Sequence, residues 1–256
     1  LNEHSKLIDK VIPTHAELWK TGQIEITTTP YAHPILPLIF DTNLAAVGDI
    51  GAELPTNRFN KPTDAAIQVE KGLDLAEKLL GQRPTGMWPA EGAVSQEVLG
   101  MFAKEGVKWI ATGEHVLSKS LEIPTFKRNT DGIVTNPEVL YTPWYGQLNR
   151  QDDVAIFFRD LSISDQVGFT YSGMSPEMAV ADMMKALEAA REVSVTMDRP
   201  LVVSIVLDGE NAWEHYQNDG IDFLSLMYET LTTTEWLKTT TPTEYIQKYG
   251  PQIDKL

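Results

Sequence analysis

The sequence predicts an α/β protein with a parallel β-barrel, and three features of the 256-residue chain lead to this prediction. Short apolar segments that suit strands alternate with longer amphipathic segments, which is the pattern of repeated β–α units. The clearest strand candidates, residues 154–160 and 201–208, are almost continuously apolar, as expected for strands buried on both faces of a parallel sheet. No glycine-rich phosphate loop or dinucleotide-binding motif follows these segments, which favours a barrel over an open doubly wound sheet.

The expected elements of the first 80 residues alternate in type. Residues 5–20 have apolar side chains at helical spacing, and residues 23–30 are rich in β-branched side chains, which favours a strand. The proline-containing stretch 31–55 indicates a loop region. Residues 63–80 have helical spacing again, and the Thr-Asp pair at their start suits a helix N-cap. This part of the chain is therefore expected to supply two helices and one strand.

The alternation continues through the rest of the chain. The stretch TGMWPAEGAVS (85–95) indicates a short strand that runs into a loop, followed by a helix near 95–105 and a strand at 107–112. An irregular region comes next, and a long helix at about 176–195 separates the two apolar strands. About five or six strands can be identified by these criteria. Because no internal repeat or low-complexity tract interrupts the pattern, the sequence predicts a single domain over residues 1–256.

The composition limits the classes of partner. The chain carries 21 Lys and Arg against 36 Asp and Glu, a net charge of −15, which repels nucleic-acid phosphates and anionic lipids. We therefore expect neither a nucleic-acid nor a membrane partner, whereas a neutral substrate is compatible with this charge. The chain has no cysteine, which excludes disulfides, cysteine zinc sites and thiol nucleophiles.

The expected location is the cytoplasm. No apolar stretch approaches the length of a membrane span, and no signal peptide is recognised. Secretion stays an alternative, because the chain begins at Leu1 rather than at a methionine. The sequence does not predict an oligomeric state.

Three strand-like segments end in a carboxylate. Glu91 follows GMWPA, Asp160 follows FFR, and Asp208 follows the apolar segment that ends in VL. In parallel barrels the active site forms at the carboxyl ends of the strands, where an acid can be partly desolvated and two carboxyl groups can take different roles. The alternative for each acid is a turn residue or a helix N-cap. The three acids together predict an active site that contains two or more carboxylates.

Tryptophan side chains lie close to these acids in the sequence. Trp88 precedes Glu91 by three residues, and Trp213 follows Asp208 by five. Flat aromatic rings are good platforms for the apolar C–H faces of sugars, although core packing is the alternative for each ring. The combination points to glycoside chemistry.

Four segments, taken in order, resemble motifs of the family 57 glycoside hydrolases, which act on α-glucans such as starch and glycogen. They are GQIEITTTPYAHPILPLI (22–39), GMWPAEGAVS (86–95), FFRDLSISDQVGF (157–169) and VVSIVLDGENAWEHY (202–216). The third is typical of the amylase and amylopullulanase branch. The family fold is an incomplete (β/α)7 barrel followed by a helical region. The family's first motif, His-Gln-Pro, is absent, and its last, aromatic motif is not evident before Leu256, so the resemblance implies a central part of the catalytic domain that lacks the first strand or two.

The resemblance implies a retaining mechanism with two catalytic residues. Glu91 stands at the position of the nucleophile and Asp208 at that of the general acid/base. Such a double displacement requires the two carboxyl groups to lie about 5–5.5 Å apart. Hydrolysis and transfer to an acceptor sugar are both compatible with these roles, and the linkage specificity, α-1,4 or α-1,6, is not predicted.

The predicted substrate-binding residues come from the resemblance and from the neighbours of the catalytic acids. His33 stands at a substrate-contacting position of the family, with structural packing as the alternative. Glu210 adjoins Asp208, with a solvated helix start as its alternative. The full set of predicted substrate-binding residues is His33, Trp88, Arg159, Asp160, Asp165, Glu210 and Trp213.

Two other functions compete with this interpretation. A metal-dependent polysaccharide deacetylase could use a similar barrel, but the five histidines are scattered and form no His-x-x-x-His pair. A non-catalytic glucan-binding remnant is the other alternative, because the first family motif is missing. We expect no metal and no cofactor, and an α-glucan oligosaccharide or polysaccharide as the partner.

Overall fold

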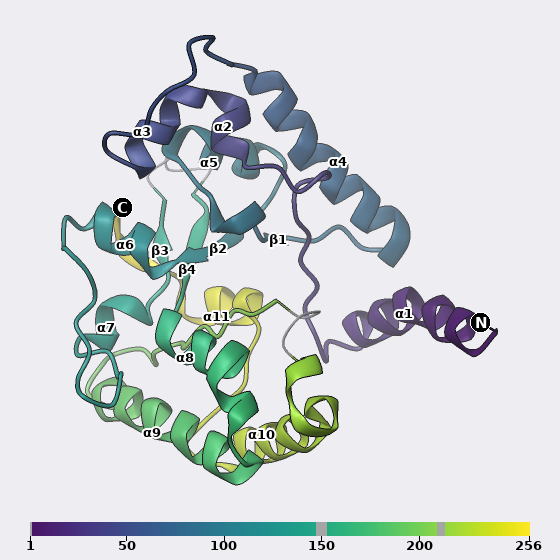
Figure 1. The fold of residues 1–256 in the computed structure, drawn as a ribbon, viewed down its shortest axis with the longest axis vertical. Coiled ribbons are helices and arrows are strands. Elements are labelled where there is room, and N and C mark those ends of the chain that lie inside the picture. Colours follow the sequence, from purple (N-terminus) through teal and green to yellow (C-terminus); the bar gives the residue numbers. More distant parts are fainter. Residues whose placement is uncertain (1, 147–152, 209–212) are drawn as a thin grey trace. The chain divides into compact units, whose positions relative to one another are not determined.

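A computed structural model describes residues 2–146, 153–208 and 213–256. The chain divides into two compact units, each built from segments that are distant in the sequence. The first unit contains residues 1–112, 144–156 and 241–256, and the second contains residues 113–143 and 157–240. Figure 1 shows the elements of both units as a ribbon.

The described residues contain a mixed, five-stranded sheet in the order β1-β2-β4-β3-β5. Its strands are β1 (Gly86–Met87), β2 (Trp109–Gly113), β3 (Trp144–Tyr145), β4 (Ala155–Arg159) and β5 (Gln252–Lys255). β1 pairs with β2 and β3 pairs with β5 in parallel, but β3 pairs with β4 in the antiparallel sense. The prediction of an all-parallel sheet is therefore wrong.

The antiparallel pair follows from the length of its connection. Residues 146–154 join β3 to β4, and this is shorter than the dozen or so residues that a parallel crossover needs. β3 lies in the stretch that was expected to be irregular, so the antiparallel pairing with β4 was not predicted. β2 and β4 themselves are confirmed as strands, and the first four residues of each are buried, as predicted for β4.

Two expected strands are not regular strands. Within residues 23–30 the structure has one isolated bridge, between Thr28 and Met87, and the Trp88 N–H donates to the Thr28 carbonyl at 2.9 Å. Within residues 201–208 the one bridge in the described structure joins Ser204 to Arg159. In the segment 201–208, side chains replace part of the ladder that a strand would have, since Ser164 and Arg159 bind the backbone of Val206.

Helices are the main regular elements of the first unit. The helices expected near 5–20, 63–80 and 95–105 are confirmed, whereas the stretch 31–55, expected as a loop, contains two short helices. The helices of this unit are α1 (Asn2–Lys20), α2 (Leu36–Phe40), α3 (Ala45–Gly48), α4 (Pro62–Leu80), α5 (Gln96–Lys104) and α11 (Pro242–Tyr249). The predicted Thr-Asp cap of α4 is wrong: Lys61 is the N-cap residue, without a side-chain hydrogen bond, and Pro62 takes the first helical position, where its missing N–H costs nothing.

A partly buried glutamate ties distant segments of the first unit together. Glu25 accepts hydrogen bonds from the Trp109 indole at 2.9 Å and from the Thr243 backbone N–H at 3.0 Å. Trp109 lies on β2, and Thr243 lies in the first turn of α11. A side chain on Gly86 would overlap the Trp109 ring, because a Cβ there would lie 2.2 Å from ring atoms. Glu25 therefore has a structural role that joins the beginning, the middle and the end of the chain.

The second unit packs helices around an aromatic core. Its helices are α6 (Glu114–Ser120), α7 (Pro137–Leu140), α8 (Leu161–Asp165), a π-helical turn (Gln166–Thr170), α9 (Pro176–Ser194) and α10 (Ile221–Thr233). α9 confirms the helix expected at 176–195, and it lies beside α10 (Figure 1). The buried core contains Met183 of α9 together with Tyr171, Tyr216 and Phe223, and these rings pack against one another.

Helix α4 holds the loop that carries His33. The Tyr31 N–H donates to the Gln68 carbonyl and the Ala32 N–H donates to the Gln68 side chain, both at 2.9 Å. One turn further along α4, Gly72 lets the loop approach closely, since a Cβ there would lie 2.4 Å from the Thr29 carbonyl oxygen. The position of His33 thus depends on a residue without a side chain in the middle of a helix.

We predict that Gly72→Ala destabilises the protein. Alanine favours a helix over glycine by about 1 kcal/mol, but the clash with backbone atoms forces the loop away from α4, at a net cost of about 1–3 kcal/mol. The matched control is Gly100→Ala in α5, where a Cβ meets nothing within 4 Å, so that change should stabilise the protein. Urea denaturation measures both changes. Equal shifts for the two variants would show that Gly72 is not needed for close packing.

Candidate functional site

The structure brings two of the predicted site residues of the first unit together. His33 Nε2 lies 3.3 Å from Glu91 Oε1, although 58 positions separate these residues in the sequence. Both side chains remain open to solvent, with His33 50% and Glu91 73% exposed. Glu91 therefore has a fixed polar neighbour and still offers a free face to a ligand.

Both residues of this pair have strained backbone conformations. The φ angle is 53° at His33 and 57° at Glu91, in the left-handed region that residues with a Cβ rarely adopt. Such a conformation costs roughly 1–3 kcal/mol per residue and persists only where its surroundings enforce it. Around Glu91 the enforcing contacts are hydrogen bonds from the Gly92 N–H to the Pro89 carbonyl at 2.8 Å and from the Thr112 hydroxyl to the Gly92 carbonyl at 2.5 Å. Strain of this kind is concentrated at functional sites.

The imidazole of His33 is oriented from both sides. Its Nδ1 lies 3.2 Å from the Thr29 hydroxyl oxygen, while its Nε2 faces Glu91. The His33 N–H also donates to the Pro30 carbonyl at 2.8 Å, which closes the turn between these residues. Thr29, His33 and Glu91 thus form a linear series in which the ring nitrogens bridge two oxygens. Sequence analysis gave no role to Thr29, four residues before His33.

Trp88 lies directly after β1, three residues before Glu91. Its backbone N–H donates to the Thr28 carbonyl, and its side chain is half-buried. A half-buried ring retains an exposed part that a sugar could contact. The structure therefore places Trp88 on the same strand-end segment as Glu91.

In the second unit, Asp208 ends the extended segment 201–208 and is exposed. The predicted site residue Glu210 lies outside the described residues. Trp213 is half-buried against the aromatic core, with its ring 6.4 Å from that of Phe223 and 5.5 Å from that of Tyr216. This packing resembles the core alternative weighed for Trp213 more than an open sugar platform.

The Arg159 side chain is committed to internal contacts. Its Nε donates to the Val206 carbonyl at 2.8 Å, and its Nη2 lies 2.5 Å from Asp165 Oδ1. The Asp165 side chain is 46% exposed, against 21% for Arg159. Of these two predicted substrate-binding residues, Asp165 is the one that presents a larger surface to a ligand.

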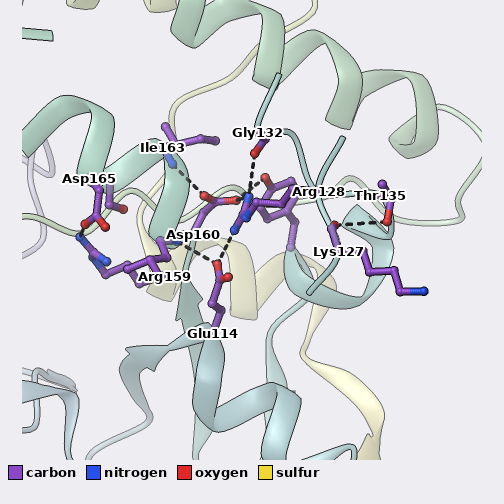
Figure 2. Close-up of polar contacts among 12 residues, drawn as sticks. Glu114, Lys127, Arg128, Gly132, Thr135, Arg159, Asp160, Ile163 and Asp165 are labelled. Carbon is purple, nitrogen blue, oxygen red and sulfur yellow. Dashed lines mark hydrogen bonds and ion pairs between the residues drawn. The ribbon is translucent and has the colours of Figure 1, made fainter. Parts of the chain in front are cut away.

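Asp160 is completely buried, so the structure contradicts direct substrate contact by this residue. Its Oδ1 accepts from the Ile163 N–H at 2.8 Å, which caps α8. Its Oδ2 accepts from the Tyr141 hydroxyl at 2.7 Å and from Arg128 Nη1 at 3.1 Å (Figure 2). Burial, followed by the charge of Asp160, raises the pKa of Tyr141, which keeps this phenol a proton donor. The helix-cap alternative weighed for the strand-end acids holds at this position.

Sequence analysis missed the partners of Asp160. Arg128 Nη2 lies 2.5 Å from Glu114 Oε2, and the same oxygen accepts from the Leu161 N–H at 2.8 Å. Glu114, Arg128, Asp160 and Tyr141 form what we call the buried ionic cluster. Figure 2 shows Glu114, Arg128 and Asp160 of this cluster. Burial lowers the pKa of Arg128, but the charges of Asp160 and Glu114 outweigh it and raise that pKa overall. A signal was present, because Glu114 follows β2 as directly as Asp160 follows β4.

Two further properties concern the described residues alone. Within residues 2–146, 153–208 and 213–256, no three His, Asp or Glu side chains are grouped so that they could hold a metal ion. Within the same ranges, no helix combines the length and the apolar character needed to cross a membrane.

Comparison with known proteins adds a family and a fold. The model of the family described as glycosyl hydrolase family 57 matches residues 1–254. No curated protein sequence matches the chain significantly.

Three solved structures resemble the fold. The α-amylase of Thermotoga maritima is 17% identical with a TM-score of 0.69, and the matched region covers 96% of this chain and 53% of the amylase chain. A branching enzyme of Thermococcus kodakaraensis is 16% identical with a TM-score of 0.69, and the matched region covers 99% of this chain and 52% of the branching-enzyme chain. The 4-α-glucanotransferase of Thermococcus litoralis is 21% identical with a TM-score of 0.64, and the matched region covers 95% of this chain and 31% of the glucanotransferase chain. The chain thus spans about half or less of the length of these relatives, and the likeness shows a barrel-like α/β fold, which confirms the predicted class.

Proposed function

Because the chain belongs to glycosyl hydrolase family 57, we propose that the protein is a retaining enzyme that acts on α-glucans with Glu91 as its nucleophile. The observation that carries this proposal is the His33–Glu91 pair. Both side chains are exposed, both backbones are held in a costly left-handed conformation, and their polar atoms lie 3.3 Å apart. A left-handed backbone also occurs at Glu122, so the proposal depends on the combination of this strain with the exposed His33–Glu91 contact.

The proposed reaction has two steps with Glu91 and Asp208 in complementary roles. In the first, the Glu91 carboxylate attacks the anomeric carbon, the glycosidic C–O bond breaks, and Asp208 gives its proton to the departing oxygen. In the second, Asp208 takes a proton from water or from a sugar hydroxyl. The oxygen of that group then attacks the anomeric carbon, and the bond to Glu91 breaks. The exposure of both side chains supports access by a polymeric substrate.

The other proposed residues bind the substrate. His33 would orient Glu91 through Nε2, while the exposed part of its ring contacts the sugar. Trp88 would stack on a sugar ring, and Asp165 would accept hydrogen bonds from sugar hydroxyls. Glu210 and Trp213 keep their predicted roles as proposals, with the packing of Trp213 against Phe223 favouring a smaller contact surface.

The substrate class rests on the family and on the fold. The three similar structures are named as an α-amylase, a branching enzyme and a 4-α-glucanotransferase. These activities share cleavage of an α-glucosidic bond and differ in whether water or a sugar is the acceptor. An α-glucan is therefore the proposed donor, with hydrolysis and transfer both within reach of the same two carboxyl groups.

We expect the protein to release α-configured products from amylose. Proton NMR of the anomeric signals, recorded before mutarotation, distinguishes retention from inversion, and chromatography of products from amylose and pullulan separates the linkage classes. Early β-anomers would contradict the double displacement. Binding of amylose without turnover would instead support the non-catalytic alternative.

A further inference from the structure

We infer that Arg159 and Ser164 are positioning residues that hold the segment leading to Asp208 by binding the backbone C=O and N–H of Val206, respectively. This inference rests on the proposed role of Asp208 as general acid/base. All the contacts that carry it lie within the second unit. The sequence prediction placed Arg159 in the substrate pocket, whereas here it acts through the backbone.

The segment 201–208 exchanges backbone partners for side-chain partners as it approaches Asp208. The Val202 N–H donates to the Tyr141 carbonyl at 2.8 Å, and the Ser204 carbonyl accepts from the Asp160 N–H at 3.0 Å. At Val206 the pattern changes. Its N–H donates to the Ser164 hydroxyl at 3.2 Å, and its carbonyl accepts from Arg159 Nε at 2.8 Å. Two residues before Asp208, the backbone N–H and C=O of Val206 are thus both hydrogen-bonded to side chains.

The alternation of side chains along an extended segment places Asp208 opposite to the core. Val203, Ile205 and Leu207 pack against the aromatic core of the second unit. With a period of two residues, Asp208 shares the other face with Val206, and it is exposed there. The apolar side chains fix which face turns outward. The two hydrogen bonds at Val206 fix how far the segment extends and at what angle.

The two side chains that bind Val206 are themselves held in place. Ser164 is completely buried on α8, and the Arg159 guanidinium is paired with Asp165 at the end of the same helix. Asp160 caps α8 from within the buried ionic cluster, and Figure 2 shows Asp160, Ile163 and the Arg159–Asp165 pair around this helix. The buried cluster, α8 and Val206 thus form a continuous support for Asp208.

Support of this kind matters because proton donation is sensitive to placement. A general acid must lie within hydrogen-bond reach of the departing oxygen, and a displacement of about 1 Å can lower the rate roughly 100-fold. The loss is largest for substrates whose leaving group needs a proton. An activated leaving group departs without one, so its release is spared.

The test compares two substrates in Ser164→Ala and Arg159→Lys. One is amylose, with a poor leaving group, and the other is a nitrophenyl α-malto-oligoside, with an activated one. We expect kcat/KM on amylose, which reports the first step, to fall about 10- to 100-fold, with a much smaller loss of kcat/KM on the nitrophenyl substrate. Ser162→Ala, two residues away on α8, is the matched control and should leave both rates unchanged. Each variant removes a different hydrogen bond to Val206, so the test still works if one of the two variants fails to fold.

Asp208→Asn separates this inference from the function on which it rests. If Asp208→Asn discriminates between the two substrates but Ser164→Ala and Arg159→Lys lower both rates equally, or neither, the positioning role is wrong while the proposed function stands. If Asp208→Asn itself lowers both rates equally, the acid/base role fails and the positioning inference falls with it. Matching discrimination by all three variants supports both.

Discussion

Glu91→Ala is expected to lower amylose turnover by about 10⁴-fold or more, as is typical when a catalytic nucleophile is removed. The small side chain leaves space beside the anomeric carbon. Added azide should enter this space, attack from the face that Glu91 would have used, and yield a glycosyl azide of inverted configuration. Rescue by azide therefore reports a nucleophile, which a loss of folding cannot imitate.

The chain offers a closely matched control for this variant. Glu122 is also an exposed glutamate with a left-handed backbone, with φ of 55° against 57° at Glu91. Glu122→Ala changes the same side chain in the same conformation but removes no proposed catalytic group. Wild-type turnover by Glu91→Ala, or an equal loss in Glu122→Ala, would contradict the assignment of the nucleophile.

Arg128→Met is expected to cause the largest loss of stability, about 3–5 kcal/mol in the free energy of unfolding. The substitution leaves Glu114, 4% exposed, and Asp160, with no exposure, as buried carboxylates without their cationic partner. Removing one member of a buried ion pair is costly because the remaining charge cannot be solvated. Urea denaturation followed by circular dichroism measures the change.

Arg83→Met is the control for burial. Arg83 contacts three carboxylates, those of Asp74, Glu77 and Glu105, but Asp74 and Glu77 are more than half exposed. Exposed ion pairs of this kind contribute about 1 kcal/mol or less, so this variant should be nearly as stable as the wild type. A triple replacement, Glu114→Gln with Arg128→Met and Asp160→Asn, should be less destabilised than Arg128→Met alone, because it leaves no unpaired charge. Equal losses for Arg83→Met and Arg128→Met would show that burial does not set the cost.

The sequence was most informative where a local pattern determines the structure. Helical spacing identified α1, α4 and α9, the strand expected at 107–112 is β2, and the continuous apolar run at 154–160 identified β4 as a buried strand. These patterns reflect burial against neighbours close in the chain or repeated along one face. The carboxylate at the end of a strand singled out Glu91, Asp160 and Asp208, but the same criterion was not applied to Glu114, which directly follows β2.

Prediction from the sequence failed where a group is bound by a side chain that is distant in the sequence. Residues 201–208 have the composition of a strand, yet Ser164 and Arg159 take the place of a neighbouring strand at Val206. The left-handed conformations of His33 and Glu91 could not be anticipated, because they run against the preference of both residue types. Asp160 shows the same limit, since its position after a strand is compatible with catalysis and with capping, and only its complete burial separates the two.

The hydrogen bonds of Glu25 have a consequence for how the protein is made. A ribosome synthesises a chain from its N-terminal side, so Glu25 emerges long before Thr243, which donates to its carboxylate. The second unit, residues 113–143 and 157–240, is complete in the growing chain before the last segment of the first unit exists. Folding during synthesis must therefore finish at the unit that was started first. Until Thr243 is synthesised, Trp109 of β2 and the segment that leads to His33 lack the residue that joins them to α11.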